Sequence, residues 1–166
     1  MKSIGTTAFY NCSRIPFGDL VLNDVESIGN RAFAGCKIDS VRIGDKLKEL
    51  WPCAFDACSN LKSIEIIGNG SCSLVNVFEG VFSNCGALER VVLGDGIREW
   101  SSYNPSVFPG CYALKEVSFG AQIKTIPSSV LKDRKSLRSV TFSSAVTSIE
   151  GDAFSGCTNL TEISSI

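Results

Sequence analysis

A short motif recurs along almost the whole chain, and it limits the fold more than any other feature of the sequence. Each copy starts at an aromatic or aliphatic residue that follows Ala or Val, and successive starts are 22 to 27 residues apart. A unit this short cannot bury its own apolar face, so the copies must stack and share one core. The periodicity therefore predicts a solenoid. We number its repeats 1 to 7 by their starting residues, Phe9, Phe33, Phe55, Phe82, Phe108, Leu131 and Phe154.

Other apolar residues keep fixed positions in each copy. Two columns, eight and five residues before the start, are predicted to face the core: Met1, Val25, Leu47, Leu74, Trp100, Ile123 and Val146, and Ile4, Ile28, Leu50, Val77, Tyr103, Ile126 and Ile149. A segment of the type Leu61-x-x-Ile64-x-Ile66 follows each start, and its last two residues have the spacing of a short strand with one buried face. We expect one strand per repeat, paired in parallel with its copies, because the connections are too short for a full crossover helix.

Cysteine follows the same period. Six of the eight cysteines stand three residues after a starting residue: Cys12, Cys36, Cys58, Cys85, Cys111 and Cys157. One helical turn would point both side chains inward, so a short helical or 3₁₀ turn is predicted there. The pattern indicates a structural column of buried thiols and not a CxxC metal or redox motif. Repeat 6 departs from it, because Arg134 occupies the cysteine position.

The combined unit, φ-x-x-I-G-x-x-A-F-x-x-C-x-x-L-x-x-I-x-I, resembles the leucine-rich repeats of the BspA-like, Treponema type, most plainly in residues 25–43 and 146–163. The resemblance implies an α/β fold, a right-handed, horseshoe-like solenoid with a parallel sheet on its concave face and short helical or 3₁₀ turns elsewhere. It also implies a cell-surface or secreted protein that acts in adhesion. Residues 1–166 would form a single domain of about seven repeats without complete caps, as in a fragment of a longer protein.

The composition excludes several classes of function. The chain has no histidine, which removes Ser-His-Asp and Cys-His catalysis and every imidazole metal site, so we expect neither a metal nor a cofactor. The formal net charge of −1 provides no general attraction for nucleic acid or anionic membranes. No segment has the length and hydrophobicity of a signal peptide or a membrane helix, so membrane insertion is not expected and a cytoplasmic location stays open.

Strand residues that alternate with the buried ones form the first candidate binding surface. On the predicted concave face these are Arg42, Glu65, Ile67, Arg90, Val92, Glu116, Ser118 and Thr141. Arg90 and Glu116 should lie side by side on adjacent strands, and a solvated ladder of opposite charges explains them without a ligand. The alternative is a platform that binds a protein or a glycan, as extended concave solenoid surfaces do.

Two neighbouring repeats carry insertions after the strand, and these define a second candidate surface. The extra residues, 68–73 and 94–99, are rich in glycine and are predicted to form loops side by side at one edge of the solenoid. The resulting ridge would offer Asn69, Ser71, Asp95 and Arg98 to a partner. Drift in a tolerant surface loop is the alternative explanation.

The sequence favours a non-catalytic interaction or adhesion module that binds a protein or glycan through the concave strands or the ridge. One alternative is a structural segment that associates end to end. Another is a glycan-processing enzyme, because glycosidases use two carboxyl groups about 5 to 9.5 Å apart and need no histidine. Glu65, Glu116 and Glu162 are the carboxylates available on the predicted face, but they lie on separated strands.

Overall fold

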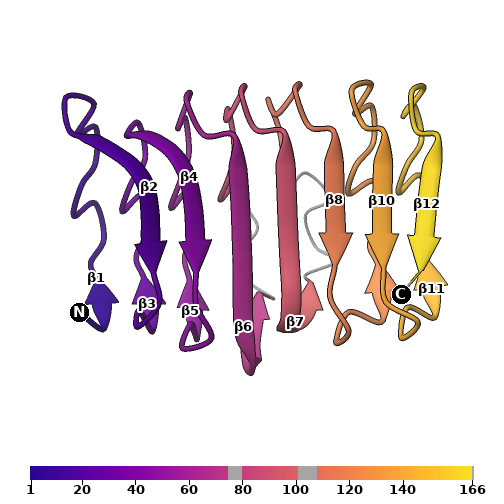
Figure 1. The fold of residues 1–166 in the computed structure, drawn as a ribbon, viewed down its shortest axis with the longest axis horizontal. Helices are drawn as coiled ribbons and strands as arrows, with labels where there is room; N and C mark the ends of the chain where they lie inside the picture. The colour runs from indigo at the N-terminus through magenta and orange to yellow at the C-terminus, as the bar shows by residue number, and fades with distance from the viewer. Residues whose placement is uncertain (75–79, 101–107, 166) are drawn as a thin grey trace.

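The chain winds as a solenoid of parallel strands in a computed structural model that describes the backbone of residues 1–74, 80–100 and 108–165 (Figure 1). Of residues 69–74 and 98–100 it describes the backbone but not the side chains. The described part contains no helix, and therefore none that could span a membrane. The predicted solenoid is confirmed.

Seven strands, one from each repeat, form the main sheet. Its order is β12-β10-β8-β7-β6-β4-β2, and every pairing is parallel. The strands are β2 (Pro16–Leu22), β4 (Lys37–Ile43), β6 (Ser63–Leu74), β7 (Arg90–Trp100), β8 (Glu116–Phe119), β10 (Ser139–Phe142) and β12 (Glu162–Ser165). Alternate residues point inward, as the spacing of two predicts.

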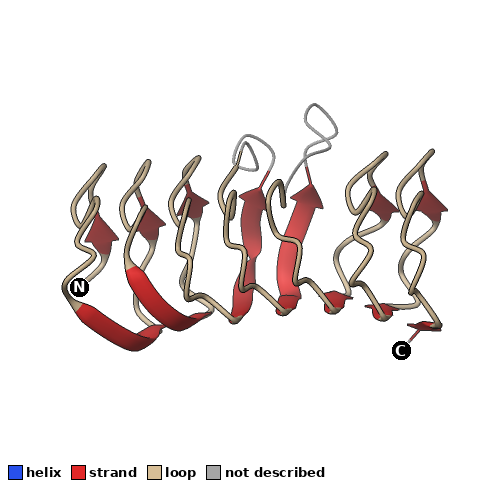
Figure 2. Ribbon diagram, turned by 90° about the horizontal axis from the view of Figure 1, so that it is seen from above, coloured by secondary structure: helices blue, strands red, loops and turns tan. Residues whose placement is uncertain are grey.

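Very short strands form on the other side of the core. They contain the column of residues five positions before each start, which the sequence identified as buried but not as extended. One small sheet joins β1 (Ser3–Ile4), β3 (Ser27–Ile28) and β5 (Glu49–Leu50), and another joins β9 (Thr125–Ile126) and β11 (Ser148–Ile149). Figure 2 shows them opposite the main sheet, so the core lies between two layers of strands.

The starting residues stack through this core. The rings of Phe9, Phe33, Phe55, Phe82 and Phe108 lie nearly parallel to their neighbours, with centroids 5.2 to 6.1 Å apart. Leu131 continues the column and is fully buried.

The two outer columns are buried through the middle of the array but not at its ends. The prediction fails there, because Met1 is 75% and Ile149 is 51% exposed. Each belongs to a terminal repeat, which has a neighbour on one side only. Four further members of these columns have side chains outside the described residues: Leu74, Val77, Trp100 and Tyr103.

The predicted helical or 3₁₀ turn after each start is wrong in its hydrogen bonding. In repeat 2 the N–H groups of Ala32, Ala34 and Cys36 bond three residues back, as in a turn. Between them, the N–H groups of Phe33 and Gly35 donate to carbonyls of repeat 3 instead. Because every second N–H is used between repeats, the consecutive bonds that a 3₁₀ helix needs cannot form. The segment is a run of β-turns stitched to its neighbour.

This alternation places two columns of residues in the left-handed region, two positions before and two positions after each start. In repeat 2 these are Arg31 (φ 52°) and Gly35 (φ 74°). The second column is rich in Gly, Asn and Asp, the residues that tolerate a positive φ best: Asn11, Gly35, Ala57, Asn84, Gly110, Asp133 and Gly156. That enrichment is a turn signal in the sequence, and the prediction of a helical turn overlooked it.

The cysteine column is buried or half-buried, and the structure gives it a specific role. From Cys36 onward, each of its thiols donates to the carbonyl of the starting residue in the preceding repeat, with sulfur–oxygen distances of 3.0 to 3.3 Å. The six cysteines of the column are free thiols. Burial raises the pKa of Cys36 and of Cys111 to about 11, which keeps both thiols protonated.

Candidate binding surface

The outer face of the main sheet, here called the sheet face, brings most of the predicted concave residues together. One row of registered partners crosses five strands: Arg42, Glu65, Val92, Ser118 and Thr141. A second row contains Arg90 on β7 and its partner Glu116 on β8. The structure therefore places these seven residues on one continuous surface, because in-register strands hold equivalent side chains side by side.

The predicted ladder of opposite charges is present on this face. Arg42 Nε lies 3.2 Å from a carboxylate oxygen of Glu65, and Arg90 Nε lies 3.5 Å from one of Glu116. All four side chains are about half exposed. Solvated pairs of this kind contribute at most about 1 kcal/mol each to stability. Their charges therefore remain accessible to a partner.

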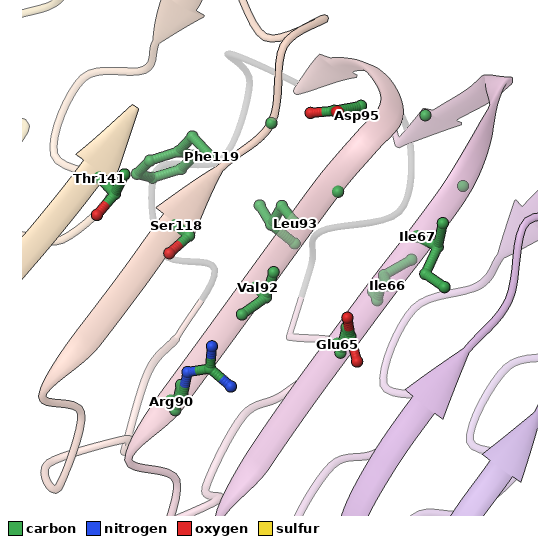
Figure 3. A pocket seen from close by; sticks show the side chains of 14 residues that line it. Glu65, Ile66, Ile67, Arg90, Val92, Leu93, Asp95, Ser118, Phe119 and Thr141 are labelled. Atoms are coloured by element: carbon green, nitrogen blue, oxygen red, sulfur yellow. The ribbon is translucent and has the colours of Figure 1, made fainter. Parts of the chain in front are cut away.

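A shallow hollow of about 520 Å³ lies over β6 and β7 and beside the end of β8, and we call it the sheet-face hollow (Figure 3). Its lining combines charged, hydroxyl and apolar side chains with exposed glycine backbone. Seven of the residues predicted for a binding role line it: Glu65, Ile67, Arg90, Val92, Asp95, Ser118 and Thr141. The hollow thus joins the first candidate surface to the start of the second.

Glycine backbone forms part of the floor of the hollow. A Cβ on Gly94 would lie 2.7 Å from the carbonyl oxygen of Ile67, and one on Gly120 would overlap the backbone of Gly94. No side chain fits at those distances, so adjacent repeats can approach this closely only with glycine. The depression exists because this part of the sheet has no side chains to fill it.

The two insertions adopt a different structure from the predicted loops. They extend β6 and β7, which remain paired in parallel through Gly68 with Gly96 and Cys72 with Ile97, after irregular steps in the register. The extensions project past the neighbouring strands (Figure 1) and bend towards the back of the solenoid (Figure 2). The expected adjacency is confirmed, but the glycines keep hydrogen-bonding partners instead of forming a loop.

Only one residue of the predicted ridge can be placed by its side chain. Asp95 is exposed, lines the sheet-face hollow, and accepts a hydrogen bond from the N–H of Ala121 at 2.8 Å. This bond fixes β7 to the turn after β8. The side chains of Asn69, Ser71 and Arg98 lie outside the described residues.

The arrangement provides recognition chemistry and lacks the geometry of a glycosidase. Figure 3 shows Glu65 and Asp95, the two carboxylates that line the hollow, towards opposite ends of it. Glu116 is paired with Arg90, and Glu162 lies two strands from Glu116, which corresponds to about 9.5 Å between equivalent backbone positions. Within the described part of the chain no three potential ligands cluster as a metal site.

The sequence-based prediction missed the glycines that form the hollow. Gly44, Gly94 and Gly120 each stand directly after the last inward-facing residue of the regular strand, and an added Cβ would collide with the preceding repeat at each of them. A glycine that recurs at one position of a repeat is a signal of close backbone approach. The recurrence of glycine therefore marks the depression in the sequence itself.

Comparison with known families gives a match over nearly the whole chain. The sequence matches six copies of the family described as BspA type leucine-rich repeat region, over residues 1–104 and 81–165. No curated protein matches the chain by sequence.

Two solved structures are similar over nearly all of the chain. A leucine-rich repeat protein of T. pallidum is 25% identical with a TM-score of 0.67, and the match covers 97% of this chain and 72% of that protein. A leucine-rich cell surface protein of Faecalibacterium prausnitzii is 21% identical with a TM-score of 0.54, covering 99% of this chain and 69% of that protein. The second similarity concerns the fold alone.

Proposed function

Because the chain belongs to the BspA-type leucine-rich repeat family, we propose that it is a non-catalytic interaction module that binds a macromolecular partner on its sheet face. The observation that carries this proposal is the convergence of seven predicted residues on the sheet-face hollow. Leucine-rich repeat proteins are generally not enzymes, and the scattered carboxylates of this face agree with a binding role.

The chemistry of the hollow favours a partner with both charged and apolar groups. Arg90 can donate to a carboxylate of the partner, and Glu65 can accept from a cation. Between them Val92 and Ile67 are only partly buried and offer apolar contact. A protein surface supplies all three kinds of group, so we infer a protein partner before a glycan.

Adhesion at the cell surface is the setting that we propose for this binding. The F. prausnitzii protein described above is a cell surface protein, and the resemblance to BspA-like repeats implies the same location. An extended face of registered strands suits contact with a large partner, because it presents many weak contacts along one rigid scaffold.

Charge reversal tests the sheet face directly. Candidate surface proteins should be tested against the wild type, Arg90→Glu, and the double variant Arg90→Glu/Glu116→Arg, which restores an ion pair in the reversed order. We expect the single variant to bind at least about tenfold more weakly, since a charged hydrogen bond is replaced by repulsion.

Lys132→Glu is the matched control, because Lys132 also forms an exposed ion pair, with Asp152 at 2.9 Å, but outside the hollow. It should bind like the wild type. Equal affinity of Arg90→Glu and Lys132→Glu for the partner would remove the sheet face as the binding surface. Circular dichroism of each variant checks that the fold is retained.

A structural role is the second candidate function, and the exposed apolar residues of the terminal repeats support it. Met1 and Val21 in repeat 1 and Ile149 and Ile163 in repeat 7 are each more than half exposed. Stacking of one solenoid on another would bury them. Sedimentation over a range of protein concentrations tests this role, and a monomer at every concentration would argue against end-to-end association.

A further inference from the structure

A second hollow lies at the opposite edge of the main sheet, where β8, β10 and β12 start. It has a volume of about 370 Å³ and is lined by Lys115, Ser136, Arg138, Asn159 and Thr161. None of these residues was selected from the sequence, and none belongs to the sheet-face hollow. We call it the basic hollow.

The repeat architecture brings its residues together. Lys115, Arg138 and Thr161 each stand directly before a strand, in repeats 5, 6 and 7. The N–H of Arg138 donates to the carbonyl of Lys115 at 2.8 Å, and that of Thr161 donates to the carbonyl of Arg138 at 3.1 Å. Asn159 is held by a bond from its side-chain amide to the carbonyl of Lys135, at 2.8 Å. The backbone thus fixes the lining before any ligand binds.

The lining is complementary to an anion. All five lining side chains carry hydrogen-bond donors, and among these described residues there is no carboxylate. Glu89 lies 2.8 Å from Lys115 and offsets that charge, so Arg138 supplies the excess positive charge. The pKa of Glu89 is lowered first by the hydrogen bond from Lys115, with smaller contributions from Lys62 and Arg138, which shows that the cations act on one region.

The size and polarity of the hollow indicate which anion fits. About 370 Å³ is in the range of sites for small organic ligands and larger than a bare ion requires. The guanidinium of Arg138 can bind a planar carboxylate or a sulfate with two parallel hydrogen bonds. Ser136, Asn159 and Thr161 can each donate to and accept from sugar hydroxyl groups.

We propose that the basic hollow binds an acidic sugar unit of a polysaccharide, with Arg138 on its carboxylate or sulfate and the hydroxyl and amide side chains on its ring hydroxyls. A peptide fits less well, because the lining residues include no apolar side chain against which its side chains could pack. The net charge of −1 means that attraction must come from this local cluster and not from the whole protein. The inference does not depend on the sheet-face proposal.

The test measures binding of three defined probes by calorimetry. They are a heparin-derived octasaccharide, a neutral dextran oligosaccharide of the same length, and a phosphoserine peptide with several phosphates. We expect the acidic oligosaccharide alone to bind, with an affinity that falls as salt is added. Tighter binding of the phosphopeptide, or no binding of the octasaccharide, would overturn the proposal.

Two substitutions locate the site. Arg138→Gln should weaken octasaccharide binding about tenfold or more, and Arg138→Lys should recover part of it by keeping the charge. Lys62→Gln is the control, because Lys62 also stands directly before a strand but lies outside the hollow. Equal losses in Arg138→Gln and Lys62→Gln would mean diffuse charge attraction and reject a site. Arg90→Glu should leave octasaccharide binding unchanged.

Discussion

Repeats 2 to 5 and repeat 6 form the same turn of the solenoid from different side chains. In the former, a phenylalanine ring stacks on its neighbours and a thiol bonds to the preceding repeat. In repeat 6, Leu131 and Arg134 replace that pair, and yet Leu131 is fully buried and the turn donates to repeat 7 in the usual way.

The comparison separates what the backbone needs from what the side chains add. The alternating turn bonds are the same in both regions, so they do not depend on Phe or Cys. Repeat 6 has a local defect instead, because Arg134 Nε is buried and, within the described residues, has no hydrogen-bond partner. Leaving such a group unsatisfied costs about 1 to 3 kcal/mol. The aromatic and thiol columns therefore stabilise a winding that the turns already define.

The largest expected effect is loss of a stacked ring. Phe82→Ala should lower the free energy of unfolding by about 3 to 5 kcal/mol, and Leu131→Ala by about 2 to 4, because the smaller side chain leaves a smaller cavity. Urea denaturation monitored by circular dichroism measures both. A larger loss in Leu131→Ala than in Phe82→Ala would contradict the greater contribution of the aromatic column.

The thiol column should make the regular repeats sensitive to alkali. Unfolded cysteines titrate near pH 8.5, whereas burial raises the pKa of Cys36 and Cys111 to about 11 in the folded protein. The folded state then holds more protons, so its stability is complete below about pH 8.5 and falls as the pH rises to about 11.

The double variant Cys36→Ala/Cys111→Ala should lose stability less steeply over that pH range in urea denaturation. Both thiols should also resist alkylation at pH 8 until the protein unfolds. Alkylation of both cysteines in the native state within minutes would show that the column is open to solvent.

Arg134→Cys converts repeat 6 to the regular pattern. The substitution removes the unsatisfied Nε and places a thiol where it can donate to the preceding repeat, so we expect a gain of about 1 kcal/mol in the free energy of unfolding. Arg134→Ala is the comparison, because it removes the guanidinium without adding a donor. A loss of stability in Arg134→Cys would show that the guanidinium itself stabilises the turn.

The smallest effect on stability is expected on the sheet face. Arg90→Gln and Glu116→Gln should each change the free energy of unfolding by less than about 1 kcal/mol, because the pair is well exposed. The same melts at low and high salt should show little difference. A loss of several kcal/mol in either variant would mean that the pair serves the fold and not a partner.

The periodic apolar residues predicted most of the fold because one position repeated seven times averages out local ambiguity. They located the starting residues, the thiol column and one main-sheet strand in each repeat. They could not reveal the alternating turn bonds, because donors such as Phe33 N–H pair with backbone of another repeat and leave no mark on side-chain spacing. The extensions of β6 and β7 were missed for a related reason, since pairing between two glycine-rich segments overrides their local preference for turns.

The candidate sites followed the same division. Alternation along the strands predicted which residues share the sheet face, and equal register predicted that Arg90 meets Glu116. It could not predict the sheet-face hollow, which depends on the missing side chains of Gly94 and Gly120. The basic hollow depends on residues outside the strands, where the period carries no information about depth.

The turn bonds also give the molecule a direction. Phe9, Phe33, Phe55 and Leu131 all donate their N–H groups towards the C-terminal side, and the carbonyls that accept them belong to the later repeat. Any cross-section of the array thus has a donor surface and an acceptor surface, comparable to the plus and minus ends of a filament. A repeat grafted into it would match its neighbours in one orientation only, so engineered lengthening must preserve chain polarity as well as period.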